Sequence, residues 1–224
     1  MKKYILLFAL LFSITAFSQT EDFSKPDYRQ IEKNVANKKS PYYFESLFDR
    51  YNRADSTMTI EEKRHLYYGY SFQPSYSPYS ISDSQDELYE ILRSEKTDTK
   101  TMEKLIKVSE KVLKDFPFNI RIKEYRMYAF KQLEKFKEAK VEETQAGIII
   151  DAILSTGDGI TKENSFYVIS TGNEYEILDI LGFRFGGEQQ LIEQKYDYLT
   201  LAENSYNING FYFDVTRLFE SFKP

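Results

Sequence analysis

Apolar side chains recur at intervals of three and four residues over much of residues 27–155, a spacing that is typical of amphipathic helices. The segment 100–117 shows this pattern most clearly. Lysine and glutamate fill one of its faces, which predicts a helix that is solvated on that side and packed on the other. The predicted packed face consists of Met102, Leu105, Ile106, Ser109, Val112, Leu113 and Phe116, of which six are apolar.

Further helices are expected on both sides of this segment, and some carry start or stop signals. Ser40 followed by Pro41 is typical of a helix start, and an aromatic stripe follows it to Tyr51. Thr59 and Ser84 each have glutamate three residues later, which is the pattern of a capping box. Gly69 is expected to end the helix that begins near Thr59. The predicted helices cover 27–37, about 41–51, 59–68, 84–94, 100–117, 119–136 and about 137–152.

Residues 69–83 interrupt the helical pattern. Two prolines and five serines preclude a regular helix there, but four aromatic residues argue against a flexible linker, since such linkers are poor in aromatic side chains. We therefore expect an ordered loop that lies on the helices.

The pattern changes again after residue 155. Residues 166–170 and 211–215 are β-branched and aromatic, and 196–201 alternates, so each predicts a strand. The stretch 173–181 fits a strand or a short helix, and Gly186-Gly187 indicates a bulge or turn. The sequence thus predicts an α+β fold, with an N-terminal and central helical region followed by a small antiparallel β-sheet at the C-terminus.

The N-terminus has the form of a cleavable signal peptide. Two lysines precede a short apolar run over 4–12, and small residues stand at Ala16 and Ser18, where signal peptidase requires them. We expect residues 1–18 to be removed and 19–224 to form a single domain, mainly helical over 19–155 and mainly stranded over 156–224. The apolar run is shorter than the roughly 20 residues that span a bilayer.

The composition of the chain limits its possible covalent links, partners and cellular location. Because the chain has no cysteine, neither a disulfide nor a lipoprotein anchor is expected. Loss of two lysines with residues 1–18 moves the net charge from −5 to −7, and no long basic block is present, so nucleic-acid binding is not expected. The sequence predicts an exported protein, periplasmic or secreted, without a membrane span after signal removal and of unknown oligomeric state.

The residues available for chemistry are few. The single histidine, His65, lies in a Glu-x-x-His sequence, but a di-iron bundle needs a second such motif, and we expect a hydrogen-bonding side chain. Asp179 and Asp214 are the best isolated carboxylates and are expected to bond helix termini or tyrosine hydroxyls. Asp158 is expected in a turn. We assign no catalytic, cofactor-binding or metal-ligating residue and favour a protein that is not an enzyme.

One candidate ligand surface remains. Tyrosine rings joined by Pro74 and Pro78 could form a stacking platform for sugar rings or an extended peptide. The alternative is that the rings bridge the early helices to those of 100–150. The candidate residues are Tyr67, Tyr68, Tyr70, Phe72, Tyr76 and Tyr79.

The sequence resembles two known protein families. Pro117 and Ala139 fall where tetratricopeptide repeats carry their closing proline and small residue, although Met127 replaces the usual glycine and no adjoining copy is readable. This resemblance implies tetratricopeptide-like helix pairs. The segments 59–70, 157–159, 166–170, 174–176 and 212–215 resemble an uncharacterised family of exported Bacteroidetes proteins, the domain of unknown function DUF4919.

These patterns favour a noncatalytic module of the cell envelope that interacts with a protein or ligand. The alternative is a carboxylate-based hydrolase or binding protein that acts on envelope glycans. The expected partner is an envelope protein or a glycan, and no cofactor is expected.

Overall fold

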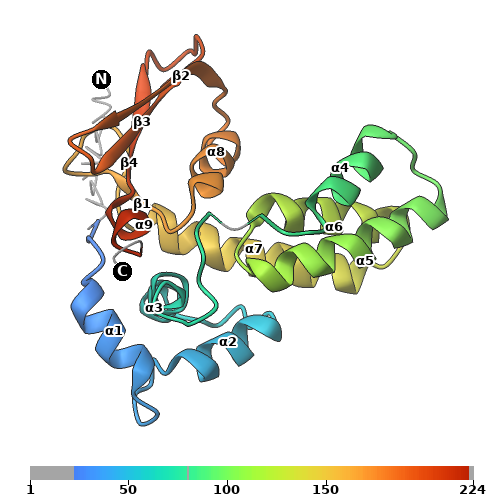
Figure 1. The fold of residues 1–224 in the computed structure, drawn as a ribbon, viewed down its shortest axis with the longest axis horizontal. Coiled ribbons are helices and arrows are strands. Elements are labelled where there is room, and N and C mark those ends of the chain that lie inside the picture. Colours follow the sequence, from blue (N-terminus) through green and yellow to red (C-terminus); the bar gives the residue numbers. More distant parts are fainter. Residues whose placement is uncertain (1–22, 80, 222–224) are drawn as a thin grey trace, which may run out of the picture.

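A computed structural model describes residues 23–79 and 81–221, so the predicted signal peptide lies outside the described residues. Seven helices precede the first strand along the described chain, and the sheet follows them, which confirms the predicted α+β class (Figure 1). Helices α5, α6 and α7 pack on one another in succession, as expected of helix pairs. The first seven helices are α1 (Tyr28–Ala36), α2 (Phe44–Asn52), α3 (Ile60–Tyr70), α4 (Gln85–Arg93), α5 (Thr99–Asp115), α6 (Ile120–Gln132) and α7 (Phe136–Leu154).

The predicted helix starts have different outcomes. The capping box at Thr59 is confirmed, because its hydroxyl accepts from the Glu62 amide and the Glu62 carboxylate accepts from the Thr59 amide. Ser84 precedes α4 but makes no side-chain cap bond. The predicted helix start at Ser40 is wrong, because α2 begins at Phe44. The Ser40 hydroxyl instead accepts from the Tyr42 amide within a turn.

The expected helix end at Gly69 is also wrong. Helix α3 continues through Gly69 to Tyr70. A Cβ added at Gly69 would lie 2.6 Å from Cγ1 of Val35 on α1, which is closer than carbon atoms pack. The glycine therefore allows α1 and α3 to approach each other closely.

The C-terminal elements form a four-stranded sheet in the order β1-β4-β3-β2. Strands β2, β3 and β4 are antiparallel as predicted, whereas β1 pairs with β4 in parallel, which the sequence did not indicate. The expected bulge at Gly186-Gly187 is present as a register shift between Phe185 and Gln189. Residues 173–180 belong to a helix, and Leu181 is its C-cap. The elements are β1 (Phe166–Tyr167), α8 (Thr171–Ile180), β2 (Phe185–Ile192), β3 (Tyr196–Leu201), β4 (Gly210–Asp214) and α9 (Thr216–Glu220).

Two hydrophobic cores hold these elements. The larger core joins α1, α2, α3 and the second half of α7 to the sheet and α8, and a smaller one lies between α4, α5 and α6. Figure 1 shows α4, α5 and α6 projecting to one side along α7, away from the sheet. Helix α2 packs on α3 and also contacts α7. Among the described residues, no helix is long and apolar enough to cross a membrane.

Candidate functional site

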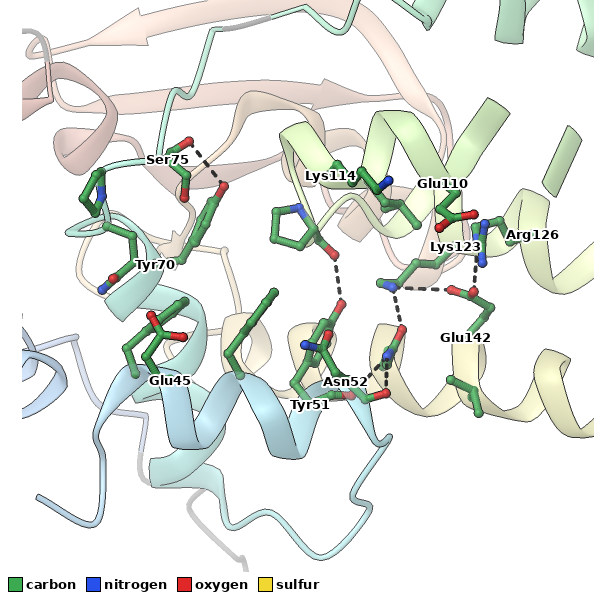
Figure 2. Close-up of a pocket in the computed structure, with 18 residues that line it drawn as sticks. Glu45, Tyr51, Asn52, Tyr70, Ser75, Glu110, Lys114, Lys123, Arg126 and Glu142 are labelled. Carbon is green, nitrogen blue, oxygen red and sulfur yellow. Dashed lines mark hydrogen bonds and ion pairs between the residues drawn. The ribbon is translucent and has the colours of Figure 1, made fainter. Parts of the chain in front are cut away.

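A groove of about 720 Å³ lies between α2 and the helices α5, α6 and α7, with the end of α3 and its following loop closing one side. We call it the central groove. Figure 2 shows Tyr70 and Ser75 at one end of it, and Lys123, Arg126 and Glu142 at the other. Its two ends therefore differ in chemistry.

Aromatic side chains form the wall on the α2 side. Phe44, Phe48 and Tyr51 follow one another at helical spacing on α2, with ring centroids 5.6 and 5.9 Å apart. Tyr70 stacks on Phe44 at 6.2 Å from the end of α3. Phe44, Tyr51 and Tyr70 are buried and Phe48 is half-buried, so the wall offers an apolar surface with limited ring exposure.

Tyr51 fixes α2 against the opposite helices. Its hydroxyl donates to the carbonyl of Pro117 at 2.9 Å, and its ring packs edge-on against Phe118 at 5.2 Å. The Gln145 amide on α7 donates to the backbone carbonyl of Tyr51 at 3.0 Å. These bonds hold the α2 wall of the groove in place.

Charged side chains from α6 and α7 form the other end. The Glu142 carboxylate accepts from Nε of Arg126 at 2.6 Å and lies 3.4 Å from Nζ of Lys123. Nζ of Lys123 also donates to the Gln145 carbonyl oxygen at 2.7 Å and sits 5.2 Å from the centre of the Tyr51 ring. Because two cations share one carboxylate, this charged cluster has a net charge of about +1 when Lys123 is protonated.

Burial makes that charge costly. Only 4% of Lys123 is exposed, and desolvation lowers the pKa of its ammonium to about 8, although the neighbouring Glu142 acts in the opposite direction. An anion placed here would favour the charged form of Lys123.

Arg126 is the member of the cluster with capacity left to bind. Its Nη1 donates to the Ile106 carbonyl at 2.8 Å and its Nε to Glu142, whereas its Nη2 has no hydrogen bond to the described residues. Its side chain is 13% exposed and lines the groove. Arginine can thus offer two further N–H groups to a planar acceptor.

The predicted ligand residues do not form one surface. Tyr67 and Tyr68 lie wholly inside the main core. The Tyr67 hydroxyl donates to the Asn173 side chain at 2.7 Å, and the Tyr68 hydroxyl donates to the Tyr167 carbonyl at 3.1 Å. Their hydroxyls join α3 to α8 and β1, beyond the helices of residues 100–150 that the alternative interpretation named.

The other four candidate residues make different contacts. Tyr70 lines the central groove, and Phe72 packs against the guanidinium of Arg217 at 4.0 Å. The Tyr76 hydroxyl donates to the Ile169 carbonyl at 2.8 Å, and Tyr79 is 45% exposed. Ligand binding by the whole set stays a prediction, and only Tyr70 belongs to the groove.

His65 has hydrogen-bonding partners in the protein. Its Nδ1 lies 2.8 Å from the Glu61 carbonyl and its Nε2 lies 2.9 Å from the Asn34 amide, while its ring stacks on Tyr42 at 4.0 Å. Burial lowers its pKa. No group of three or more potential metal-ligating side chains occurs within the described ranges.

Each isolated carboxylate has a partner in the protein, and the partner of Asp179 lies 58 residues away in the sequence. Asp179 forms an ion pair with Arg121, and Asp214 accepts from the Thr216 amide at the start of α9 at 3.0 Å. Asp158 accepts from the Ile160 amide at 3.0 Å and lies in a turn, as expected.

Glu174 on α8 and Asp197 on β3 form a carboxylate pair that the sequence analysis missed. Glu174 is fully buried and Asp197 is nearly so. Burial, and then the charge of Asp197, raise the pKa of Glu174 well above its usual value, which favours its protonated form. The Gln189 amide donates to Asp197 at 2.9 Å. Neither carboxylate lines the central groove.

The central groove, the carboxylate pair and both cores all lie within a range that one protein-family model covers, residues 29–223. The chain belongs to this family, domain of unknown function DUF4919. Neither the curated proteins nor the solved structures gave a match. The range of the DUF4919 domain begins in α1 and ends after α9, so the groove is built from the domain itself.

Proposed function

We propose that this DUF4919 chain is a noncatalytic interaction module of the cell envelope and that it binds its partner in the central groove. The groove is the observation that carries the proposal. It combines a wall of aromatic rings with a partly buried charged end, and ligand sites commonly join an apolar lining to a few placed polar groups.

The charges in the groove favour binding over acid–base chemistry. Glu142, its buried carboxylate, accepts from Arg126 and also lies beside Lys123, so it serves as a counter-ion. Glu45 and Glu110 are exposed on the rim. A glycosidase needs one carboxyl that donates a proton and a second carboxylate opposite it. The ion-paired Glu142 is poorly suited to the first of these roles.

The proposed cellular location rests on the sequence alone. Lysines, a short apolar run and small residues at Ala16 and Ser18 are what a cleavable export signal requires. Mass spectrometry of the protein isolated from its native cells should find an N-terminus at Gln19. An intact Met1 in that material would contradict export by this route.

Partner binding in the groove can be tested by site-specific photo-crosslinking. We expect a benzophenone amino acid at Glu110, on the groove rim, to give a discrete adduct with one envelope component. Lys111 is equally exposed on α5 but does not line the groove, so the same label there is the matched control. Identical adducts from both positions, or none from Glu110, would refute groove binding. Conversion of envelope glycans by the purified protein would refute its noncatalytic character.

A further inference from the structure

The charged end of the central groove indicates what kind of group a ligand presents there. Glu142 balances only one of the two cations Lys123 and Arg126, and all three side chains are largely buried. The other lining charges, Glu45, Glu110 and Lys114, are exposed, where water and salt screen them. The local field at the buried end is therefore set by the net positive cluster, because charges interact more strongly away from water.

The geometry of the donors fits a carboxylate. Nη2 of Arg126 has no hydrogen bond to the described residues. Lys123 lies three residues earlier on α6, on the same side of the helix. A carboxylate accepts from a guanidinium in a planar arrangement and would supply the missing negative charge.

The aromatic end indicates what accompanies the carboxylate. Phe44, Tyr51 and Tyr70 are at least nine-tenths buried, so they present little of the flat ring face on which a sugar stacks. A branched or aromatic side chain can instead fill the space beside half-buried Phe48. Polar side chains on the rim, such as Asn52 and Gln73, can bond to peptide amides.

We propose that the central groove binds a short acidic peptide segment, with an apolar side chain against the α2 wall and a neighbouring carboxylate at Arg126 and Lys123. This inference rests on the proposed function and specifies the partner of the same groove. Figure 2 shows the two ends at which these groups would lie, with Tyr51 between them.

Two matched probe peptides test the carboxylate directly. One is acetyl-Gly-Leu-Phe-Asp-Gly-amide, and the other has Asn in place of Asp, which keeps the shape and removes the charge. Titration of the ¹⁵N-labelled mature protein should shift amide signals of α2 and α6, with the Asp peptide binding about tenfold more tightly, as expected for one charge-assisted hydrogen bond.

A variant on the rim provides a test that leaves the buried cluster intact. Lys114→Glu reverses an exposed charge that lines the groove and should weaken binding of the Asp peptide several-fold at low salt while leaving the Asn peptide unaffected. Lys111→Glu makes the same charge change outside the groove and should have little effect. Equal weakening by both variants would mean that overall charge, and no groove contact, attracts the probe.

The outcomes separate the inference from the proposed function. Equal affinity for the Asp and Asn peptides, with shifts in the groove, would overturn the carboxylate and leave groove binding in place. Tighter binding of a uronic-acid oligosaccharide than of the Asp peptide would overturn the peptide as occupant. Absence of groove shifts with every probe at millimolar concentration would overturn the inference and, together with absent crosslinks at Glu110, the proposed function.

Discussion

Replacing Lys123 by methionine should change how the stability of the protein depends on pH. Burial lowers the pKa of Lys123 from 10.5 in the unfolded chain to about 8 in the fold. Between these pH values the unfolded chain holds a proton that the folded chain has released, so stability rises as pH rises. The difference of 2.5 pKa units corresponds to about 3 kcal/mol across the window.

Chemical unfolding at a series of pH values between 8 and 10.5 measures this effect. The free energy of unfolding of the wild-type protein should gain about 3 kcal/mol relative to Lys123→Met over the window. Tyrosines that titrate in the same range are present in both proteins, so their contribution largely cancels in the difference. Lys114→Met is the matched control, because Lys114 lines the same groove but is exposed. Its difference from the wild type should stay nearly flat.

Parallel pH profiles for the wild type and Lys123→Met would refute the reasoning. They would mean that the ammonium is not desolvated, and hence that the charged end of the groove is open to water. The electrostatic argument for an anionic ligand would then lose its basis, since a solvated cation cluster attracts an anion only weakly.

Three further changes have expected outcomes. Gly69→Ala should lower the free energy of unfolding by about 1–3 kcal/mol, because the added methyl group makes α3 clash with α1. The control is Gly147→Ala, whose added methyl group meets no atom within 4 Å, so the free energy of unfolding should stay unchanged or rise slightly. Thermal melts compare the two variants. Tyr70→Ala should cost about 3 kcal/mol because it empties a buried ring site, and an unchanged melting temperature would contradict a structural role. Burial raises the pKa of Glu176 from 4.5 to about 7, so the folded protein should lose about 3 kcal/mol of stability as pH rises across that range. Glu176→Gln should flatten this dependence of stability on pH. An unchanged dependence in denaturant titrations of the variant would contradict the shift.

Helices α1 to α7 were predictable because each carries its own periodic pattern. Helix α5 is longer than one heptad and has a continuous apolar face, so its limits were nearly correct. Short elements lack such a signal. Strand β1 has two residues, and its parallel pairing with β4 depends on where α8 and the sheet lie in three dimensions. Residues 173–181 were ambiguous because so short a stretch gives few turns of either period.

The site was not predictable, and the reason is its long-range assembly. Lys123 and Glu142 are 19 residues apart on different helices and meet because α6 packs against α7. In a chain with 30 basic and 35 acidic residues, neither stood out. The aromatic stripe on α2 was visible in the sequence, but the side it faces is set by Tyr70 of α3 and by Phe118.

The tyrosine rings suggested a stacking platform for a ligand, but several tyrosine hydroxyls join distant parts of the fold. Tyr51, Tyr68 and Tyr76 donate to backbone carbonyls 66, 99 and 93 residues away. In a chain without cysteine, such bonds provide long-range connections that disulfides often supply in exported proteins. The two differ in origin: a disulfide acts largely by restricting the unfolded chain, whereas each hydroxyl bond stabilises only the folded state, by about 1 kcal/mol. The fold should therefore lose these connections together when it unfolds, and the bond from Tyr51 makes the wall of the central groove part of that cooperative unit.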